Sequence, residues 1–223
     1  MDIIPNFICV GVQKAGTTWL YEELNKHQDI TMPSKKELRN FDPWPSNPNY
    51  LKNFKNCTGI TGDITPEYFY GENSAHQIKA IFPDCKLFVI LRNPSDRAFS
   101  QWRMARNLKN INLNKSFIDC FKENARDMRY RGLYLKHILK FKSVFPNFKV
   151  VIYDNLVKDP KSTIESICEF IGAEPKFENS QWLDMPYSDD NNQMSLEDSN
   201  FTIEYYKSSI TELEEYLNIH IGW

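Results

Sequence analysis

The chain has 223 residues, and its 27 Lys and Arg against 29 Asp and Glu give a net charge of −2. A nearly neutral total argues against nucleic-acid binding, which usually needs a basic face. With 41% hydrophobic and 25% charged residues, the composition is typical of a globular protein and excludes a disordered or fibrous chain. We expect a single domain over residues 1–223 with a substantial core.

The cysteines are odd in number, scattered along the chain, and lie at Cys9, Cys57, Cys85, Cys120 and Cys168. They form no C-x-x-C pair and no Cys/His set with zinc spacing, so we expect no metal site. Scattered thiols are typical of the reducing cytosol. The N-terminus is too polar for a signal peptide and no apolar run reaches membrane-spanning length. These features predict a soluble, cytoplasmic protein with no membrane partner.

Residues 7–24 combine a buried strand at 7–12, a tight polar turn at 13–16 and an amphipathic helix from about Thr17. A strand that enters a helix through a Gly-containing turn directs free backbone N–H groups at one point, and the helix dipole adds to them. Lys14 contributes a full positive charge, while Thr17 and Thr18 contribute hydroxyl donors. The pattern therefore predicts an anion site.

The same stretch is close to the nucleotide P-loop pattern G-x-x-x-x-G-K-[ST]. Gly11 and Gly16 have the required spacing, and Thr18 falls at the [ST] position. The lysine, however, stands inside the loop as Lys14, and Thr17 follows the second glycine. Two alternatives remain open at this point: a P-loop kinase or NTPase that uses ATP and magnesium, and a plain strand–turn–helix.

The rest of the chain alternates strands with helices. Continuous apolar runs indicate buried strands at 86–91 and 149–153, and a shorter strand is expected within 59–69. Helices are expected at 74–82, from 94, at 113–124, 130–145, 160–171 and 201–217, and a long loop at 173–200. This alternation predicts a three-layer α/β domain, P-loop-like, with a mainly parallel sheet of four to five strands flanked by helices.

Two further segments lie where they can contribute to a site. Arg92 directly follows the strand at 86–91, and Ser100 lies on the helix that Pro94 begins. Ligands of open parallel sheets bind at such strand ends. The charged segment 34–42 follows the first helix and precedes three prolines, so it is expected to be a surface loop that folds back over the anion site.

Four stretches, in the right order, resemble the sulfotransferases that use 3'-phosphoadenosine 5'-phosphosulfate (PAPS). Residues 14–19 resemble the family's 5'-phosphosulfate loop, and residues 92–100 resemble its 3'-phosphate motif R-N-P-x-D-R-A-x-S. Segments within 131–160 and the ending 205–223 are similar to later parts of the family. The resemblance implies a PAPS site without a metal, made by Lys14, Ala15, Gly16, Thr17, Thr18, Trp19, Arg92, Ser100 and Arg131.

The segment 36–42 resembles K-E-x-H-F-F-D of the heparan-sulfate and related carbohydrate branch of this family. The resemblance makes Glu37 the catalytic base and Asp42 a supporting acid, with Lys36 and Arg39 on the substrate side. Within this segment the sequence departs from the branch at Arg39, which replaces a histidine, and at Asn40. It also departs from the branch at Ile64, which lies later in the chain. As other branches use a histidine base, the alternatives are His27 and His76.

The expected reaction is in-line transfer of a sulfuryl group to a hydroxyl or amine of a carbohydrate or small molecule. Lys14 and the loop amides are expected to stabilise the charge that develops on the leaving oxygen. Partial desolvation is expected to raise the pKa of Glu37 toward neutrality. A catalytically silent nucleotide-binding module remains a further alternative. The sequence predicts neither the acceptor nor the oligomeric state.

Overall fold

The computed structural model describes residues 3–175 and 193–223, so most of the expected loop at 173–200 lies outside the described residues. The chain divides into two compact units. The described residues within 3–91 and 140–175 form the first, which we call the sheet unit. Those within 92–139 and 193–223 form the second, which we call the helical unit.

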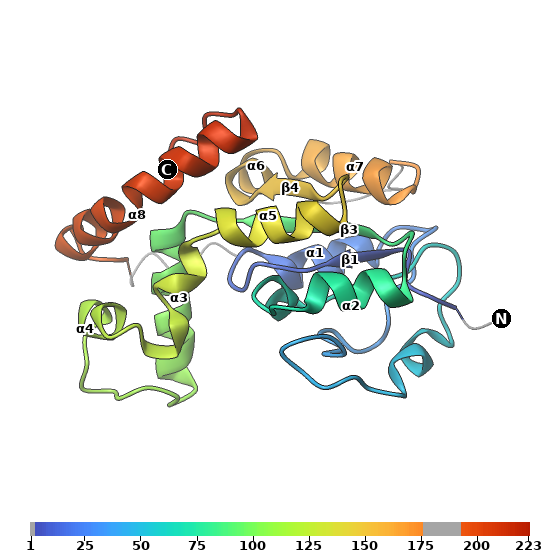
Figure 1. Ribbon diagram of the computed structural model, residues 1–223, viewed down its shortest axis with the longest axis horizontal. Helices are drawn as coiled ribbons and strands as arrows, with labels where there is room; N and C mark the ends of the chain where they lie inside the picture. The colour runs from blue at the N-terminus through green and yellow to red at the C-terminus, as the bar shows by residue number, and fades with distance from the viewer. Residues whose placement is uncertain (1–2, 176–192) are drawn as a thin grey trace. The chain divides into compact units, whose positions relative to one another are not determined.

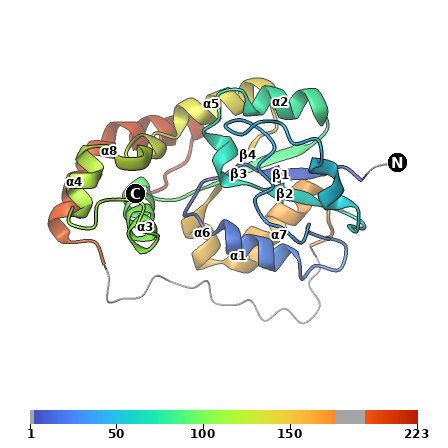
Figure 2. The ribbon, with the colours of Figure 1, turned by 90° about the horizontal axis from the view of Figure 1, so that it is seen from below.

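The sheet unit contains four parallel strands in the order β2-β1-β3-β4, shown in Figures 1 and 2. The strands are β1 (Phe7–Cys9), β2 (Gly62–Ile64), β3 (Lys86–Leu91) and β4 (Lys149–Ile152). In β3 every residue after the first is buried, as expected for an apolar run covered on both faces. The predicted mainly parallel sheet is confirmed.

Helices cover both faces of this sheet. They are α1 (Thr17–Leu24), α2 (Ser74–Ile81), α6 (Tyr153–Lys158), α7 (Pro160–Ile171) and the end of α5 (Leu135–Val144). In Figure 2, α2 and α5 lie on one side of the sheet, and α1 and α7 lie on the other. The three layers of the predicted α/β fold are therefore present.

Aromatic packing joins the layers of the sheet unit to two short 3₁₀ turns, η1 (Tyr50–Phe54) and η2 (Pro66–Phe69). The ring of Phe69 stacks on that of Phe141 with a centroid separation of 6.1 Å. Phe141 in turn stacks on Phe148 at 5.0 Å. Such contacts bury large apolar areas and hold η2 against α5.

The helical unit packs α3 (Pro94–Asn107) against α8 (Leu196–Leu217) and α4 (Phe117–Lys122). Two 3₁₀ turns, η3 (Ala125–Asp127) and η4 (Tyr130–Gly132), connect α4 to the start of α5. Its core includes Ala98, Phe117, Phe121, Met128 and Tyr206. No helix in the described ranges is both long enough and apolar enough to cross a bilayer.

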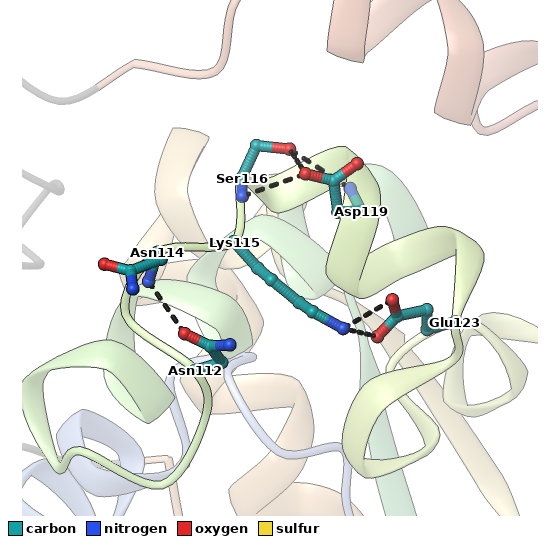
Figure 3. A network of polar contacts seen from close by, with 6 residues as sticks. All are labelled: Asn112, Asn114, Lys115, Ser116, Asp119 and Glu123. Atoms are coloured by element: carbon teal, nitrogen blue, oxygen red, sulfur yellow. Dashed lines mark hydrogen bonds and ion pairs between the residues drawn. The ribbon is translucent and has the colours of Figure 1, made fainter.

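A capping box sets the start of α4, as Figure 3 shows. The Ser116 hydroxyl accepts a hydrogen bond from the Asp119 N–H at 3.2 Å, and the Asp119 carboxylate accepts one from the Ser116 N–H at 3.2 Å. Lys115 reaches over to Glu123 with an Nζ–Oε1 distance of 2.5 Å. Because the box satisfies the first N–H groups, the helix begins at Phe117 and not at 113.

Three other boundaries differ from the sequence-based expectation. The helix expected at 130–145 is interrupted between η4 and α5, and α6 was not expected at all. The last helix begins at Leu196, one turn before the predicted 201. There the Ser195 hydroxyl accepts a hydrogen bond from the Asp198 N–H at 3.1 Å. This S-x-x-D cap can be recognised in the sequence, and it marks the residue where the last helix begins.

Candidate active site

The turn between β1 and α1, which we call the anion loop (residues 11–18), is built to leave backbone N–H groups available. Lys14 and Gly16 both have positive φ, 73° and 75°. Gly16 is the N-cap of α1 and has no side chain to accept from the helix, and no acidic residue lies in the first turn. Because neither kind of side-chain acceptor is supplied, the positive end of α1 suits an external anion.

The predicted donor-site residues of the anion loop differ in the solvent exposure of their side chains. Thr18 is exposed and Lys14 is half-buried, whereas Ala15 and Thr17 are buried. Thr18 and Lys14 are therefore the accessible side chains among the predicted donor-site residues of the loop. Trp19 is only 5% exposed, which favours core packing over direct contact with PAPS.

Gly11 lets η2 pack against the entrance of the anion loop. A Cβ at this position would lie 2.9 Å from the Phe69 Cβ and 3.1 Å from the Pro66 carbonyl oxygen. The Phe69 N–H also donates to the Val10 carbonyl at 2.9 Å. A side chain at Gly11 would push these segments apart, so the first glycine of the motif is required by close approach.

The charged segment 34–42, which we call the base loop, holds Glu37 between two cations. One carboxylate oxygen lies 3.1 Å from the Lys36 Nζ and the other lies 3.0 Å from the Arg39 Nη2. Glu37 and Arg39 both have positive φ, 62° and 54°, which is uncommon for residues with a side chain. The Arg39 guanidinium also lies 5.3 Å from the centre of the Trp44 ring. Positive φ at residues that carry a side chain is a form of backbone strain, and such strain clusters at functional sites.

The expected rise in the pKa of Glu37 is wrong for this arrangement. Partial burial does raise the pKa of the carboxyl, but Lys36 and Arg39 lower it by charge and by hydrogen bonds. The net result is a pKa below the ordinary value of 4.5. The cations stabilise the ionised form more than burial penalises it. Glu37 is thus a carboxylate at neutral pH.

Replacing Arg39 with Ala should raise the pKa of Glu37, because one of the two cations that counter its burial is removed. If Glu37 must be ionised for turnover, the acid limb of the kcat/KM profile will move to higher pH in this variant. The same loss weakens the folded state above the ordinary carboxyl pKa, since a lowered pKa contributes stability there and loses it as pH falls. The measurement is a pH–rate profile.

Lys35→Ala is the matched control, because Lys35 is an exposed cation of the same loop. Its acid limb should coincide with that of the unmodified protein. An unchanged acid limb in Arg39→Ala would show that the ion pair does not set the charge state of Glu37 in solution.

The base loop lies near the end of β1. Burial raises the pKa of the Cys9 thiol to about 12, while a hydrogen bond with Gly11 and the charge of Lys36 act in the opposite direction. Lys36 is thus close enough to influence the last residue of β1, where the anion loop follows. The structure therefore brings the charge of Lys36 near the strand end from which the anion loop follows.

Asp42 anchors the other end of the base loop. Its Oδ2 accepts from the Asn73 N–H at 3.1 Å, and its own N–H donates to the Gln77 Oε1 at 2.8 Å. Both partners belong to the start of α2, so the carboxylate ties the loop to that helix. Its role as a supporting acid stays a prediction.

In the helical unit, Arg92 is placed by its neighbours on both sides. Asn93 caps α3 by accepting from the Ser95 N–H at 2.9 Å. The Tyr134 hydroxyl donates to the Arg92 carbonyl at 2.7 Å, and Tyr134 follows the η4 turn that carries Arg131. The structure therefore brings the Arg92 and Arg131 segments together. Ser100 lies on α3 and is half-buried.

Arg97 and Gln101 have a role that the sequence did not predict. Arg97 is fully buried, and its Nη1 donates to the Gln101 Oε1 at 2.7 Å. Its Nη2 donates to the Met128 carbonyl, while the Gln101 Nε2 donates to the Arg126 carbonyl at 2.9 Å. The pair holds the backbone just before Arg131. The i, i+4 spacing of Arg and Gln was the available signal.

His27 has both ring nitrogens engaged in structural contacts. Its Nδ1 accepts from the Asp29 N–H at 3.1 Å, and its Nε2 lies 2.6 Å from the Glu174 carbonyl oxygen. The Nε2 must then carry the proton, and the ring is buried. This arrangement favours a structural histidine. His76, the other alternative base, is exposed on α2.

Within residues 3–175 and 193–223, no three His, Cys, Asp or Glu side chains gather as a metal site. The five cysteines are buried and unpaired with one another. The metal-free site stays a prediction.

A parallel α/β sheet with an anion loop after its first strand defines a class of proteins that bind phosphate or sulfate groups. The sequence profile of the sulfotransferase domain matches residues 5–217. The chain belongs to this sulfotransferase family.

Relatives and solved structures agree with this family. The human bifunctional heparan sulfate N-deacetylase/N-sulfotransferase 3 is 28% identical over 207 residues, which cover 82% of this chain but only 24% of that protein. A sulfotransferase from Alicyclobacillus acidocaldarius is similar in fold, with a TM-score of 0.85 at 23% identity and 98% coverage of both chains. A mouse sulfotransferase complexed with PAP (3'-phosphoadenosine 5'-phosphate) has a TM-score of 0.62 at 16% identity, covering 98% of this chain and 90% of its own.

Proposed function

We propose that the protein transfers the sulfuryl group of PAPS to a hydroxyl or amine of a carbohydrate or small-molecule acceptor. The observation that carries the proposal is the anion loop, where Lys14 stands beside a helix start that lacks a side-chain cap. The family profile spans both compact units, which supports one sulfotransferase domain over residues 1–223.

The donor has two charged ends, and the chain carries a motif for each. Lys14 and the backbone amides from Gly16 to Thr18 are assigned to the 5'-phosphosulfate, whereas the Ala15 N–H already donates to the Val12 carbonyl at 3.2 Å. Arg92 and Ser100 are assigned to the 3'-phosphate, since a guanidinium binds a phosphate through two parallel hydrogen bonds. Arg131 is added to them because Tyr134 joins its segment to Arg92.

Sulfuryl transfer resembles phosphoryl transfer in its demands on the protein. The transition state is loose, so positioning and charge stabilisation supply most of the rate enhancement. Negative charge grows on the oxygen that joins sulfur to the leaving phosphate. Lys14 and the amides of the anion loop stabilise that charge without reorganising. A sulfuryl group carries less charge than a γ-phosphoryl group, so a divalent metal is not required.

Glu37 is proposed as the base that takes the proton of the acceptor. Its lowered pKa keeps it ionised at neutral pH and able to accept a proton. Its ion pairs with Lys36 and Arg39 hold the carboxylate in place but also weaken it as a base. We propose that the acceptor engages one of these cations when it binds, which frees a carboxylate oxygen for the proton.

The acceptor class is proposed from the base loop and from the relative that is named for heparan sulfate. The test supplies PAPS with a glucosamine-containing oligosaccharide, either with free amines or fully N-acetylated, and with simple alcohols. Release of PAP and the mass of the product are measured. Sulfation of either sugar or of an alcohol supports the proposal, and the amine and acetyl forms distinguish N- from O-transfer. Absence of transfer to all of them would contradict it.

A further inference from the structure

We propose that Asp63 is a positioning residue that fixes the base loop, in part through the hydroxyl of Tyr68. The inference deepens the proposed function and rests on its assignment of Glu37 as the base. Asp63 lies in the middle of β2 and is 1% exposed. No catalytic or binding role was assigned to it from the sequence.

The Asp63 carboxylate is surrounded by donors. Its Oδ2 accepts from the Tyr68 hydroxyl at 2.9 Å and from the Tyr50 hydroxyl at 3.1 Å. Its Oδ1 accepts from the Thr65 hydroxyl at 2.7 Å. Burial raises the pKa of this carboxyl, and the backbone of Leu38, next to Glu37, is among the neighbours that lower it. Because the three hydroxyls can all donate, the network satisfies an ionised carboxylate.

A second connection to the base loop runs through Tyr68. The Asn40 N–H donates to the Tyr68 hydroxyl at 2.8 Å, and the same hydroxyl donates onward to Asp63. One buried carboxylate thus holds the loop at Asn40 through Tyr68, and the backbone of Leu38 lies near enough to act on the same carboxyl.

These contacts account for where the charged side chains lie. Leu38 and Asn40 are each only 4% exposed, so both residues are buried in the protein. The neighbouring charged side chains are more exposed: Arg39 is 54% exposed and Glu37 is 33% exposed. Both residues also have positive φ. The anchor at Asp63 therefore presents Glu37 at the surface with its two cations.

A charge buried in a short strand carries a desolvation cost that an apolar residue would avoid. At Asp63 the cost is offset by hydrogen bonds from three hydroxyls, and the one from Tyr68 leads on to the base loop. The arrangement therefore gives the loop a single conformation rather than simply adding to the core.

Tyr68→Phe tests the connection, and Tyr50→Phe is its matched control. Both hydroxyls donate to the same oxygen of Asp63, and both rings pack edge-on against Phe41, at 5.2 and 5.5 Å. Only the Tyr68 hydroxyl also binds the Asn40 amide. The readouts are hydrogen exchange at that amide and the NMR titration of the Glu37 carboxylate.

In Tyr68→Phe we expect the Asn40 amide to exchange about tenfold faster, as for the loss of one net hydrogen bond. The titration of Glu37 should move toward its ordinary value as its ion pairs loosen. In Tyr50→Phe both readouts should match the unmodified protein. Equal behaviour of the two variants would overturn the inference.

Asp63→Asn provides a second variant if Tyr68→Phe does not fold, because it keeps the size of the side chain while replacing an acceptor with a donor. Faster exchange at both Leu38 and Asn40 is expected, and unchanged exchange at both would overturn the inference. Glu37→Gln separates this inference from the base assignment. Full turnover in Glu37→Gln would remove Glu37 as the base, while the exchange of Leu38 and Asn40 would still report whether Asp63 fixes the loop.

Discussion

Glu37→Gln should lower kcat by about 10²- to 10⁴-fold, the range that a positioned general base contributes. The amide keeps the size of the side chain but cannot accept the acceptor's proton. The donor motifs are untouched, so the affinity for PAP should not change. Steady-state kinetics with PAPS and calorimetry with PAP measure the two quantities separately.

Glu22→Gln is the control for this variant, since Glu22 is an exposed carboxylate on α1 outside the base loop. It should retain full turnover. If Glu37→Gln also retained it, the base would have to be sought elsewhere, and the exposed His76 would be examined before the buried His27. If Glu37→Gln lost PAP affinity as well, its role would be in the donor site.

Arg92→Ala should weaken PAP binding by about 2–5 kcal/mol, or roughly 30-fold to several thousand-fold. The guanidinium is assigned to the 3'-phosphate, and its loss leaves that charge without its bidentate partner. ADP carries no 3'-phosphate, so its affinity should stay the same. The expected result is a loss of the preference for PAP over ADP.

Arg103→Ala is the matched control, because Arg103 lies on the same helix, is half-buried, and falls outside the R-N-P-x-D-R-A-x-S motif. It should leave both affinities unchanged. Ser100→Ala should cost less than Arg92→Ala, about 1 kcal/mol, since a hydroxyl gives a single uncharged donor. An equal loss of PAP and ADP affinity in Arg92→Ala would contradict the assignment to the 3'-phosphate.

The parts of the fold that the sequence predicted well depend on local signals. The apolar run of β3 and the proline that begins α3 gave their element boundaries directly. The same holds for α7, which begins at Pro160 and ends before Gly172 with φ of 93°. Glycine spacing and the displaced lysine marked the anion loop. Each signal lies within a few residues of the feature that it predicts.

The charge state of Glu37 could not be predicted because it depends on backbone conformation. Lys36 and Arg39 are visible in the sequence, but the sequence does not show that they converge on one carboxylate, in a loop where Glu37 and Arg39 both have positive φ. Burial alone favours a raised pKa of Glu37, and the two cations reverse the direction of the shift.

Asp63 and Arg97 were missed for a related reason. Both are charged residues that are almost fully buried, and their partners lie in other segments of the chain. Asp63 bonds to Tyr50 and Tyr68, and Arg97 bonds to the Met128 carbonyl. A charged residue inside an otherwise apolar strand is a readable signal, but the sequence does not show which donors will surround it.

The shift of the thermal midpoint with PAP, against ADP and against ATP with and without magnesium, tests the central claim most directly. A ligand at a hundred times its Kd stabilises the folded state by about 2.7 kcal/mol, which for a chain of this size raises the midpoint by roughly 5–10 °C. PAP is expected to raise the midpoint more than ADP or ATP does, with no requirement for magnesium. Stabilisation by ATP with magnesium and indifference to PAP would contradict the sulfotransferase account and favour a P-loop kinase.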